Sequence, residues 1–190
     1  MLAFDYRQFD LVAQVHQTLL NVRSLLAEAG ADVINLGCLP DTPFDHMEET
    51  IAALKAEGFK VSVDSANVSE LSRAVAAGAD ALGFVMYRKS PRWVDPSVAR
   101  SIIADLPPFV LPVGVFVNED AAAVRTLMDD CGFALAQLHG DETAAYCQSL
   151  GRPVLKALRV KDRGSFLALA EYQGRARVRG VLIDAFSEHA

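Results

Sequence analysis

The chain has 190 residues, of which 52% are hydrophobic and 22% charged, and its mean hydropathy is +0.21. This supplies apolar material for one sizeable core rather than two, so we predict a single domain over residues 1–190. The net charge of −6 argues against a nucleic-acid partner. The longest apolar run, residues 109–117, is too short for a membrane helix, which needs about 20 residues.

The cysteines and histidines point to a reduced chain without a metal. The three cysteines form no Cys-x-x-Cys pair, and Asp5 and Tyr6 stand where a secretory signal would be apolar. We therefore expect a cytoplasmic protein. No spacing brings three histidine or cysteine ligands together, so no metal site is predicted.

Short apolar runs alternate with amphipathic segments along the whole chain. Residues 1–4 are a candidate strand, and residues 9–29 fit a long helix. Seven clear strands follow, each rich in Val, Ile, Leu or Phe, at residues 32–37, 60–64, 81–86, 112–117, 133–139, 154–158 and 180–184. Helical patterns lie between them at residues 42–56 and 67–78, from Asp95-Pro96 onward, and at residues 119–130, 141–150 and 162–172.

This strict alternation predicts an α/β fold with a parallel sheet, closed either as a doubly wound open sheet or as an eight-stranded barrel. Polar residues stand at the carboxyl ends of almost every strand, among them Asn35, Asp64, Gln137 and Asp184. That pattern favours the mouth of a barrel over a single crevice. We predict a TIM (β/α)8-type barrel with seven clear parallel strands, a candidate eighth at the N-terminus and the last helix missing.

Four motifs resemble one enzyme family in order and spacing. They are Lys-Ser-Pro-Arg at residues 89–92, Gly-Val-Phe-Val-Asn-Glu at 114–119, Gln-Leu-His-Gly-Asp-Glu at 137–142 and Val-Leu-Ile-Asp-Ala at 181–185. Together they resemble phosphoribosylanthranilate isomerase over residues 72–186.

The resemblance implies a barrel that carries out an Amadori rearrangement in tryptophan biosynthesis. Such an enzyme is an intramolecular oxidoreductase that acts on a small phosphorylated sugar and uses no cofactor. Asp184 matches the acid that protonates the ribose ring oxygen, and Arg92 matches the arginine that binds the anthranilate end. Gln137 and His139 line the same mouth and are expected to bind the substrate.

The chain departs from the family pattern in two places. The catalytic base of the family is a cysteine at the end of the first strand, and Val63 stands at that position here. Asp64, beside it, is our candidate for a substitute base, and a polar residue without a catalytic role is the alternative reading. The Gly-rich phosphate-binding segment of the family does not follow Asp184 in these residues. We therefore expect isomerase activity to be impaired.

Residues 1–66 resemble dihydropteroate-synthase-like barrels instead, in which a Ser-Val-Asp strand lies at the pterin pocket. Asp64 is the residue that carries this likeness. The chain is thus predicted to be a composite, with residues 1–66 from one source and residues 67–190 from the other. Residues 1–4 and 32–36 would then occupy the seventh and eighth strand positions of the barrel, beside residues 60–64 as the first and 180–184 as the sixth.

Three functions remain open at this point: an isomerase, a catalytically inactive chimeric or designed barrel scaffold, and a pterin-binding protein. The strand count adds a structural alternative. Either residues 1–4 complete the barrel, or the chain forms a homodimer that covers the gap.

Overall fold

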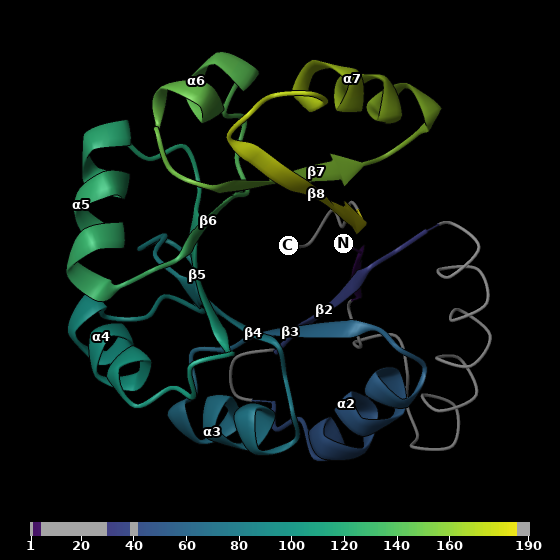
Figure 1. Ribbon diagram of the computed structural model, residues 1–190, viewed down its shortest axis with the longest axis vertical. Coiled ribbons are helices and arrows are strands. Elements are labelled where there is room, and N and C mark those ends of the chain that lie inside the picture. Colours follow the sequence, from purple (N-terminus) through teal and green to yellow (C-terminus); the bar gives the residue numbers. More distant parts are fainter. Residues whose placement is uncertain (1, 5–29, 39–41, 186–190) are drawn as a thin grey trace.

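The computed structural model describes residues 2–4, 30–38 and 42–185, and its strands form a closed parallel barrel (Figure 1). Each strand pairs with the next along the chain. The strands are β1 (Leu2–Phe4), β2 (Val33–Gly37), β3 (Lys60–Asp64), β4 (Ala81–Val85), β5 (Leu111–Phe116), β6 (Leu135–Leu138), β7 (Val154–Val160) and β8 (Val178–Ala185). The predicted TIM-type barrel is confirmed.

Helices form an outer layer around the strands (Figure 1). They are α2 (Met47–Ala56), α3 (Val68–Ala76), α4 (Pro96–Ala104), α5 (Ala121–Cys131), α6 (Ala144–Ser149) and α7 (Leu169–Tyr172), which follows the 3-10 turn η2 (Arg163–Ala168). The predicted segment 162–172 is therefore mostly 3-10 rather than α-helical. The predicted helix at residues 9–29 lies outside the described residues, as does the position of any helix after β8.

Side-chain caps explain where four of these helices begin. Asn67, Asp95, Asp120 and Thr143 each accept a hydrogen bond from a backbone N–H of the first turn, at α3, α4, α5 and α6 respectively. Proline follows directly at the start of α4, where its missing N–H costs nothing. The helix starts predicted at residue 67 and at Asp95-Pro96 are confirmed.

Strand β1 closes the barrel. Leu2 pairs with Ile34 on one side and with Ile183 on the other, and all of these pairings are parallel. β1 and β2 therefore lie between β8 and β3, at the positions expected for residues 1–4 and 32–36. Of the two alternatives for the strand count, the structure takes the one in which residues 2–4 supply the eighth strand.

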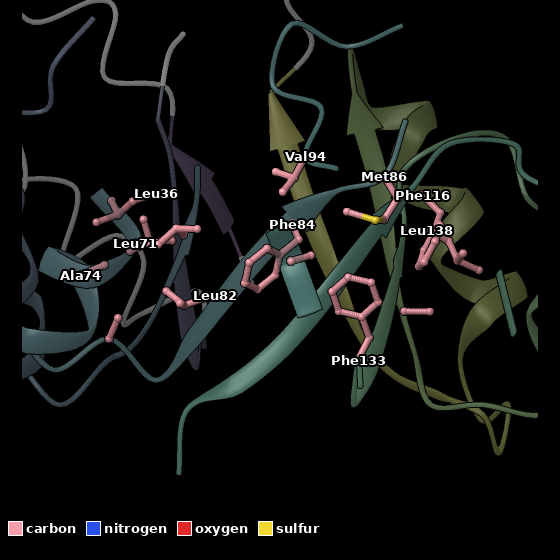
Figure 2. Close-up of a cluster of buried hydrophobic side chains, with 14 of the residues drawn as sticks. Leu36, Leu71, Ala74, Leu82, Phe84, Met86, Val94, Phe116, Phe133 and Leu138 are labelled. Carbon is pink, nitrogen blue, oxygen red and sulfur yellow. The ribbon is translucent and has the colours of Figure 1, made fainter. Parts of the chain in front are cut away.

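A continuous apolar layer fills the space between the strands and the helices. Phe133 lies between Phe84 and Phe116, with ring centroids 5.8 Å and 6.3 Å apart (Figure 2). Leu36 and Leu82 from the strands are buried in the same core cluster as Leu71 and Ala74 from α3, which Figure 2 also shows. Since neighbouring residues of a strand point to opposite faces, the residues between these core positions face the barrel interior.

The described part of the chain contains no helix with the length and apolar character needed to cross a membrane.

Candidate functional site at the barrel mouth

Polar side chains gather at the carboxyl ends of the strands. Val61 and Val63 of β3 pack against the helices, which turns Ser62 and Asp64 toward the barrel interior. By the same alternation, Asn35 of β2, Gln137 of β6 and Asp184 of β8 face the interior. Ligand-binding groups of barrel enzymes stand at this end.

Gln137, His139 and Asp184 form a hydrogen-bonded chain across two strands that are not neighbours. His139 Nε2 lies 3.0 Å from Oδ2 of Asp184, and its Nδ1 lies 3.4 Å from Nε2 of Gln137. When the Gln137 amide donates to Nδ1, the Nε2–H of the imidazole donates to Oδ2 of Asp184. The imidazole thus occupies one carboxylate oxygen of Asp184 and leaves Oδ1 for a ligand.

Asp64 is buried in the interior, with 5% of its surface exposed. Asn35 Nδ2 donates to its Oδ2 at 2.9 Å. Burial raises the pKa of the Asp64 carboxyl, and the negative charge of Asp184 acts in the same direction. The hydrogen bond from Asn35 and the charges of Arg92 and His139 oppose that increase.

Gly83 makes room for the Asp64 carboxyl. The two residues are register partners on β3 and β4, and a Cβ at Gly83 would lie 1.8 Å from Oδ1 of Asp64. A glycine is needed here because any larger side chain would clash with the Asp64 carboxyl, and close approach of this kind is a common reason for glycine inside a strand.

Arg92 brings a cation to the same end of the barrel. It lies in the loop after β4, and its Nη1 atom would be 3.1 Å from a Cβ at Gly37, where β2 ends. Its charge acts on Asp64, as do those of His139 and Asp184. The structure therefore places all five residues predicted for the site at the barrel mouth, where hydrogen bonds join Gln137, His139 and Asp184.

A cavity of about 750 Å3 opens beside Arg92, between the loops that follow β2, β3 and β4. Its lining includes Cys38, Ser65, Glu70, Arg73 and Arg92. Arg73 donates to both carboxylate oxygens of Glu48, at 2.6 Å each. Because Arg73 is already paired with Glu48, a ligand carboxylate would have to compete with that ion pair to bind Arg73. Arg92 is therefore the lining cation that is better placed to bind a ligand carboxylate.

Cys38 does not replace the missing cysteine of the sequence pattern. It is buried and continues the outward-facing positions of β2, on the face opposite to Asn35. Burial raises the pKa of its thiol to about 12, and the charges of Glu70 and Asp64 contribute to that increase. A thiol with this pKa is not ionised near neutral pH, so it is a poor base.

Glu70 stands three residues after the Asn67 cap, the spacing of a capping box, but its carboxylate takes other partners. It accepts the Ser65 hydroxyl at 2.5 Å and the Phe44 N–H at 3.4 Å. Glu70 therefore fastens the loop after β3 to the loop before α2. The sequence marks Glu70 only as part of a helix cap, because its actual partners are distant along the chain.

A buried ion pair behind the mouth was also missed. Lys156 Nζ donates to Glu142 at 2.9 Å and to the backbone carbonyl oxygens of Leu138 and Gly140. Glu142 accepts in turn from the backbone N–H groups of Asn118 and Gly140. Lys156 faces the helical layer from β7, so it does not pair with Asp184 at the mouth.

Comparisons with known proteins place the chain beside one enzyme family. The model of the family N-(5'phosphoribosyl)anthranilate (PRA) isomerase matches residues 61–190. An isomerase of that name from Citrifermentans bemidjiense is 51% identical over 114 residues, which are 60% of this chain and 53% of that protein. One from Pelobacter propionicus is 46% identical over 124 residues, or 65% and 57%. The chain thus spans just over half the length of these curated relatives.

Solved structures agree with this placement. Phosphoribosyl anthranilate isomerase from Thermotoga maritima superposes with a TM-score of 0.64 at 32% identity, covering 69% of this chain and 63% of that one. A second isomerase structure, in complex with reduced 1-(o-carboxyphenylamino)-1-deoxyribulose 5-phosphate, gives 0.62 at 34% identity, covering 67% and 66%.

Dihydropteroate synthase structures cover more of the chain at lower identity. The enzyme from Vibrio fischeri superposes over 96% of this chain and 86% of its own, with a TM-score of 0.65 and 15% identity. An identity this low shows the shared barrel fold alone. It gives no support to the composite origin predicted for residues 1–66.

Proposed function

Because the chain belongs to the N-(5'-phosphoribosyl)anthranilate isomerase family, we propose that it isomerises a phosphorylated aminoaldose to the corresponding aminoketose. Asp184 is the general acid, Asp64 is the general base, and Arg92, Gln137 and His139 bind the substrate. The observation that carries the proposal is the buried Asp64 carboxyl, which interacts electrostatically with Arg92, His139 and Asp184 at one barrel mouth.

Asp184 begins the reaction by giving its proton to the ring oxygen of the sugar. The bond between C1 and that oxygen breaks, and the lone pair of the substrate nitrogen forms a C=N double bond to C1. The hydrogen bond between His139 and Oδ2 orients the carboxyl and stabilises the carboxylate that the transfer leaves behind. Gln137 holds the imidazole in the orientation that this role requires.

Asp64 completes the isomerisation by removing the proton from C2. The electron pair of the broken C–H bond forms a C1–C2 double bond, the positive charge on nitrogen is neutralised, and the resulting enol tautomerises to the ketone. A raised carboxyl pKa makes ionised Asp64 a stronger base than a solvated aspartate. The bonds rearrange within the substrate, and the enzyme exchanges only protons with it, so the proposal requires no cofactor or metal.

Arg92 supports the choice of substrate. A guanidinium group binds a planar carboxylate through two parallel hydrogen bonds, and the cavity beside Arg92 is lined by residues of three loops. We assign the aromatic carboxylate end of the substrate to this cavity. The reacting carbons would then lie between Asp64 and Asp184.

The alternative is a barrel of the same family without catalysis. The feature that suggests it is Val63 at the position of the family's cysteine. Among the described residues, no contact at the barrel mouth favours a pterin ligand over the isomerase substrate.

Steady-state conversion of phosphoribosylanthranilate, followed by loss of anthranilate fluorescence, tests the proposal. Asp184→Asn should lower kcat by about 100-fold or more, since general acid catalysis contributes on that order. Asp105→Asn, the same change at an exposed aspartate after α4, is the matched control and should leave kcat unchanged. Turnover that survives Asp184→Asn would remove the acid from the mechanism, and absence of turnover in the folded wild type would favour the scaffold.

We also propose a homodimer as the assembled state. The similar isomerase from Thermotoga maritima is dimeric. Sedimentation of the full chain decides the matter, and a monomer at micromolar concentration would contradict the proposal.

A further inference from the structure

The contacts of Asp64 give a role to a residue that lies outside the matched residues 61–190. We propose that Asn35 is a positioning residue, whose amide N–H holds Oδ2 of Asp64 and thereby fixes the orientation of the carboxyl and favours its ionised form. This inference rests on the base role proposed for Asp64. It deepens that role by naming the residue that orients the carboxyl.

The placement of Asn35 follows from strand register. Asn35 on β2 is the register partner of Ser62 on β3, and Asp64 is the next residue of β3 on the same face. Diagonal neighbours on one face of a sheet are within reach of each other's side chains. Asn35 and Asp64 are 3% and 5% exposed, and the bond between Nδ2 and Oδ2 is 2.9 Å long. Water does not compete freely for a bond buried to this degree.

The orientation of the Asn35 side-chain amide is set by Asp64, as the surroundings of Asn35 Oδ1 show. Within the described part of the chain, Asn35 Oδ1 is buried without a hydrogen-bond partner. Turning the amide over would place that oxygen, an acceptor, against the carboxylate of Asp64. The orientation with Nδ2 toward Asp64 is therefore maintained by Asp64 itself, and this bond is what the Asn35 side chain contributes.

The free oxygen of Asp64 completes the assignment. Oδ1 is likewise buried without a partner among the described residues, and it lies over Gly83, where a side chain would displace it. A carboxyl group carries its proton on the oxygen that is not already accepting a hydrogen bond from an N–H donor. When Asp64 is protonated, its proton therefore lies on Oδ1, while Oδ2 keeps the bond from Asn35.

Other charged groups also affect the pKa of Asp64, and a test has to separate their effects from that of the Asn35 hydrogen bond. Arg92 in the loop after β4 and His139 after β6 favour the ionised form, whereas Asp184 on β8 opposes it. The thiol of Cys38, after β2, is itself influenced by the charge of Asp64. None of these four side chains is altered by substitution of Asn35.

Carbon-13 NMR of the side-chain carboxyl groups measures the titration of Asp64 directly, with Asp64→Asn identifying the signal by its loss. Asn35→Leu keeps the size of the side chain and removes the N–H donor. Since a hydrogen bond to the ionised form lowers a carboxyl pKa, this variant should shift the Asp64 midpoint to higher pH. Ser62→Ala, a buried change on the same strand, is the matched control and should leave the midpoint in place.

Asn35→Asp supplies the second variant. Two carboxyl groups that share one bond titrate in two coupled steps, so the single Asp64 transition should split into two. An Asp64 midpoint that Asn35→Leu does not move, or that Ser62→Ala moves as far, would overturn the inference. So would a single unshifted transition in Asn35→Asp.

Measuring kcat as a function of pH distinguishes failure of the Asn35 role from failure of the base role proposed for Asp64. In Asn35→Leu, kcat at neutral pH should fall about 10-fold to 100-fold, the size expected for a lost hydrogen bond to a charged group. The acidic limb of the pH profile should move upward together with the NMR midpoint. A midpoint that moves while the profile stays would uphold Asn35 as the residue that positions the carboxyl but refute Asp64 as the base.

Discussion

At the scale of single residues, the barrel mouth holds a carboxyl group whose ionisation opposes folding. Burial raises the pKa of Asp64 above the value of an exposed aspartate, so the folded chain holds this proton over a pH range in which the unfolded chain has released it. The contribution of Asp64 to stability is fully present below the ordinary carboxyl pKa. It is lost as pH rises toward the raised pKa of the folded state.

Asp64→Asn should therefore raise the melting temperature at neutral pH. The amide keeps the hydrogen-bonding shape of the protonated carboxyl and has no charge to desolvate. The gain should shrink as pH falls to about 4, where an unperturbed aspartate takes up its proton. Thermal unfolding of both chains at neutral and acidic pH measures the effect. A lower melting temperature of the variant at neutral pH would contradict a carboxyl whose pKa is raised by burial.

Residues differed in how far the sequence revealed them. The sequence alone could propose a set of candidate site residues, because each stands at a strand end or in a loop motif: Asp64, Arg92, Gln137, His139 and Asp184. Asn35 had been noted only as a polar strand end, since its role depends on register between β2 and β3. Registers of parallel strands are set by packing and crossover length, which the local pattern does not encode.

At the scale of elements, the loop between β6 and α6 is fastened to the barrel wall by Lys156 and Glu142. Both side chains are almost fully buried, at 1% and 2% exposure. Tyr172 donates its hydroxyl proton to the Glu142 carbonyl oxygen at 2.9 Å, which ties α7 to the same loop. Since His139 lies in this segment, the ion pair also supports the bond between His139 and Asp184.

Lys156→Met should destabilise the fold by about 3–5 kcal/mol, because it leaves the Glu142 carboxylate buried without its counterion. Adding Glu142→Gln should recover part of that loss, since the second change removes the unpaired charge. Denaturant unfolding of the single and double variants measures both effects. A single variant within about 0.5 kcal/mol of wild type, the range of ordinary surface changes, would show that the pair is not held as described.

Strands were easier to predict than helices in this chain. The strand segments were recognised from their apolar β-branched runs, and the caps at Asn67 and Asp95 marked two helix starts. The segment at residues 162–172 was assigned as one helix, yet most of it is 3-10. Ser165, whose N–H and hydroxyl both bond to Asp162, binds the turn locally and competes with regular helix formation.

At the scale of the whole molecule, closure of the barrel depends on a short segment far from its partners in sequence. β1 contributes three residues, and it satisfies the edges of both β2 and β8. Composition and alternation predicted the barrel, whereas the choice between closure by residues 1–4 and dimerisation over the gap needed the structure. That choice depends on non-local backbone pairing, for which a sequence of three residues carries no distinguishing pattern.

Deleting residues 1–4 should open the barrel between β2 and β8. Amide hydrogens of those two strands should exchange faster with solvent, whereas those of β5, which keeps both neighbours, should stay protected. The unpaired edges should also make the truncated chain prone to association. Hydrogen exchange followed strand by strand checks this. Equal protection of β2 in both chains would contradict closure by β1.

The central claim is that this barrel isomerises its substrate with a carboxylate in place of the family's thiol. Turnover of phosphoribosylanthranilate by wild type, Asp64→Asn and Cys38→Ser tests it most directly. The account predicts that Cys38→Ser keeps wild-type kcat and that Asp64→Asn, although folded, loses about 100-fold or more. A wild type without turnover, an Asp64→Asn chain that keeps its rate, or a loss confined to Cys38→Ser would contradict it.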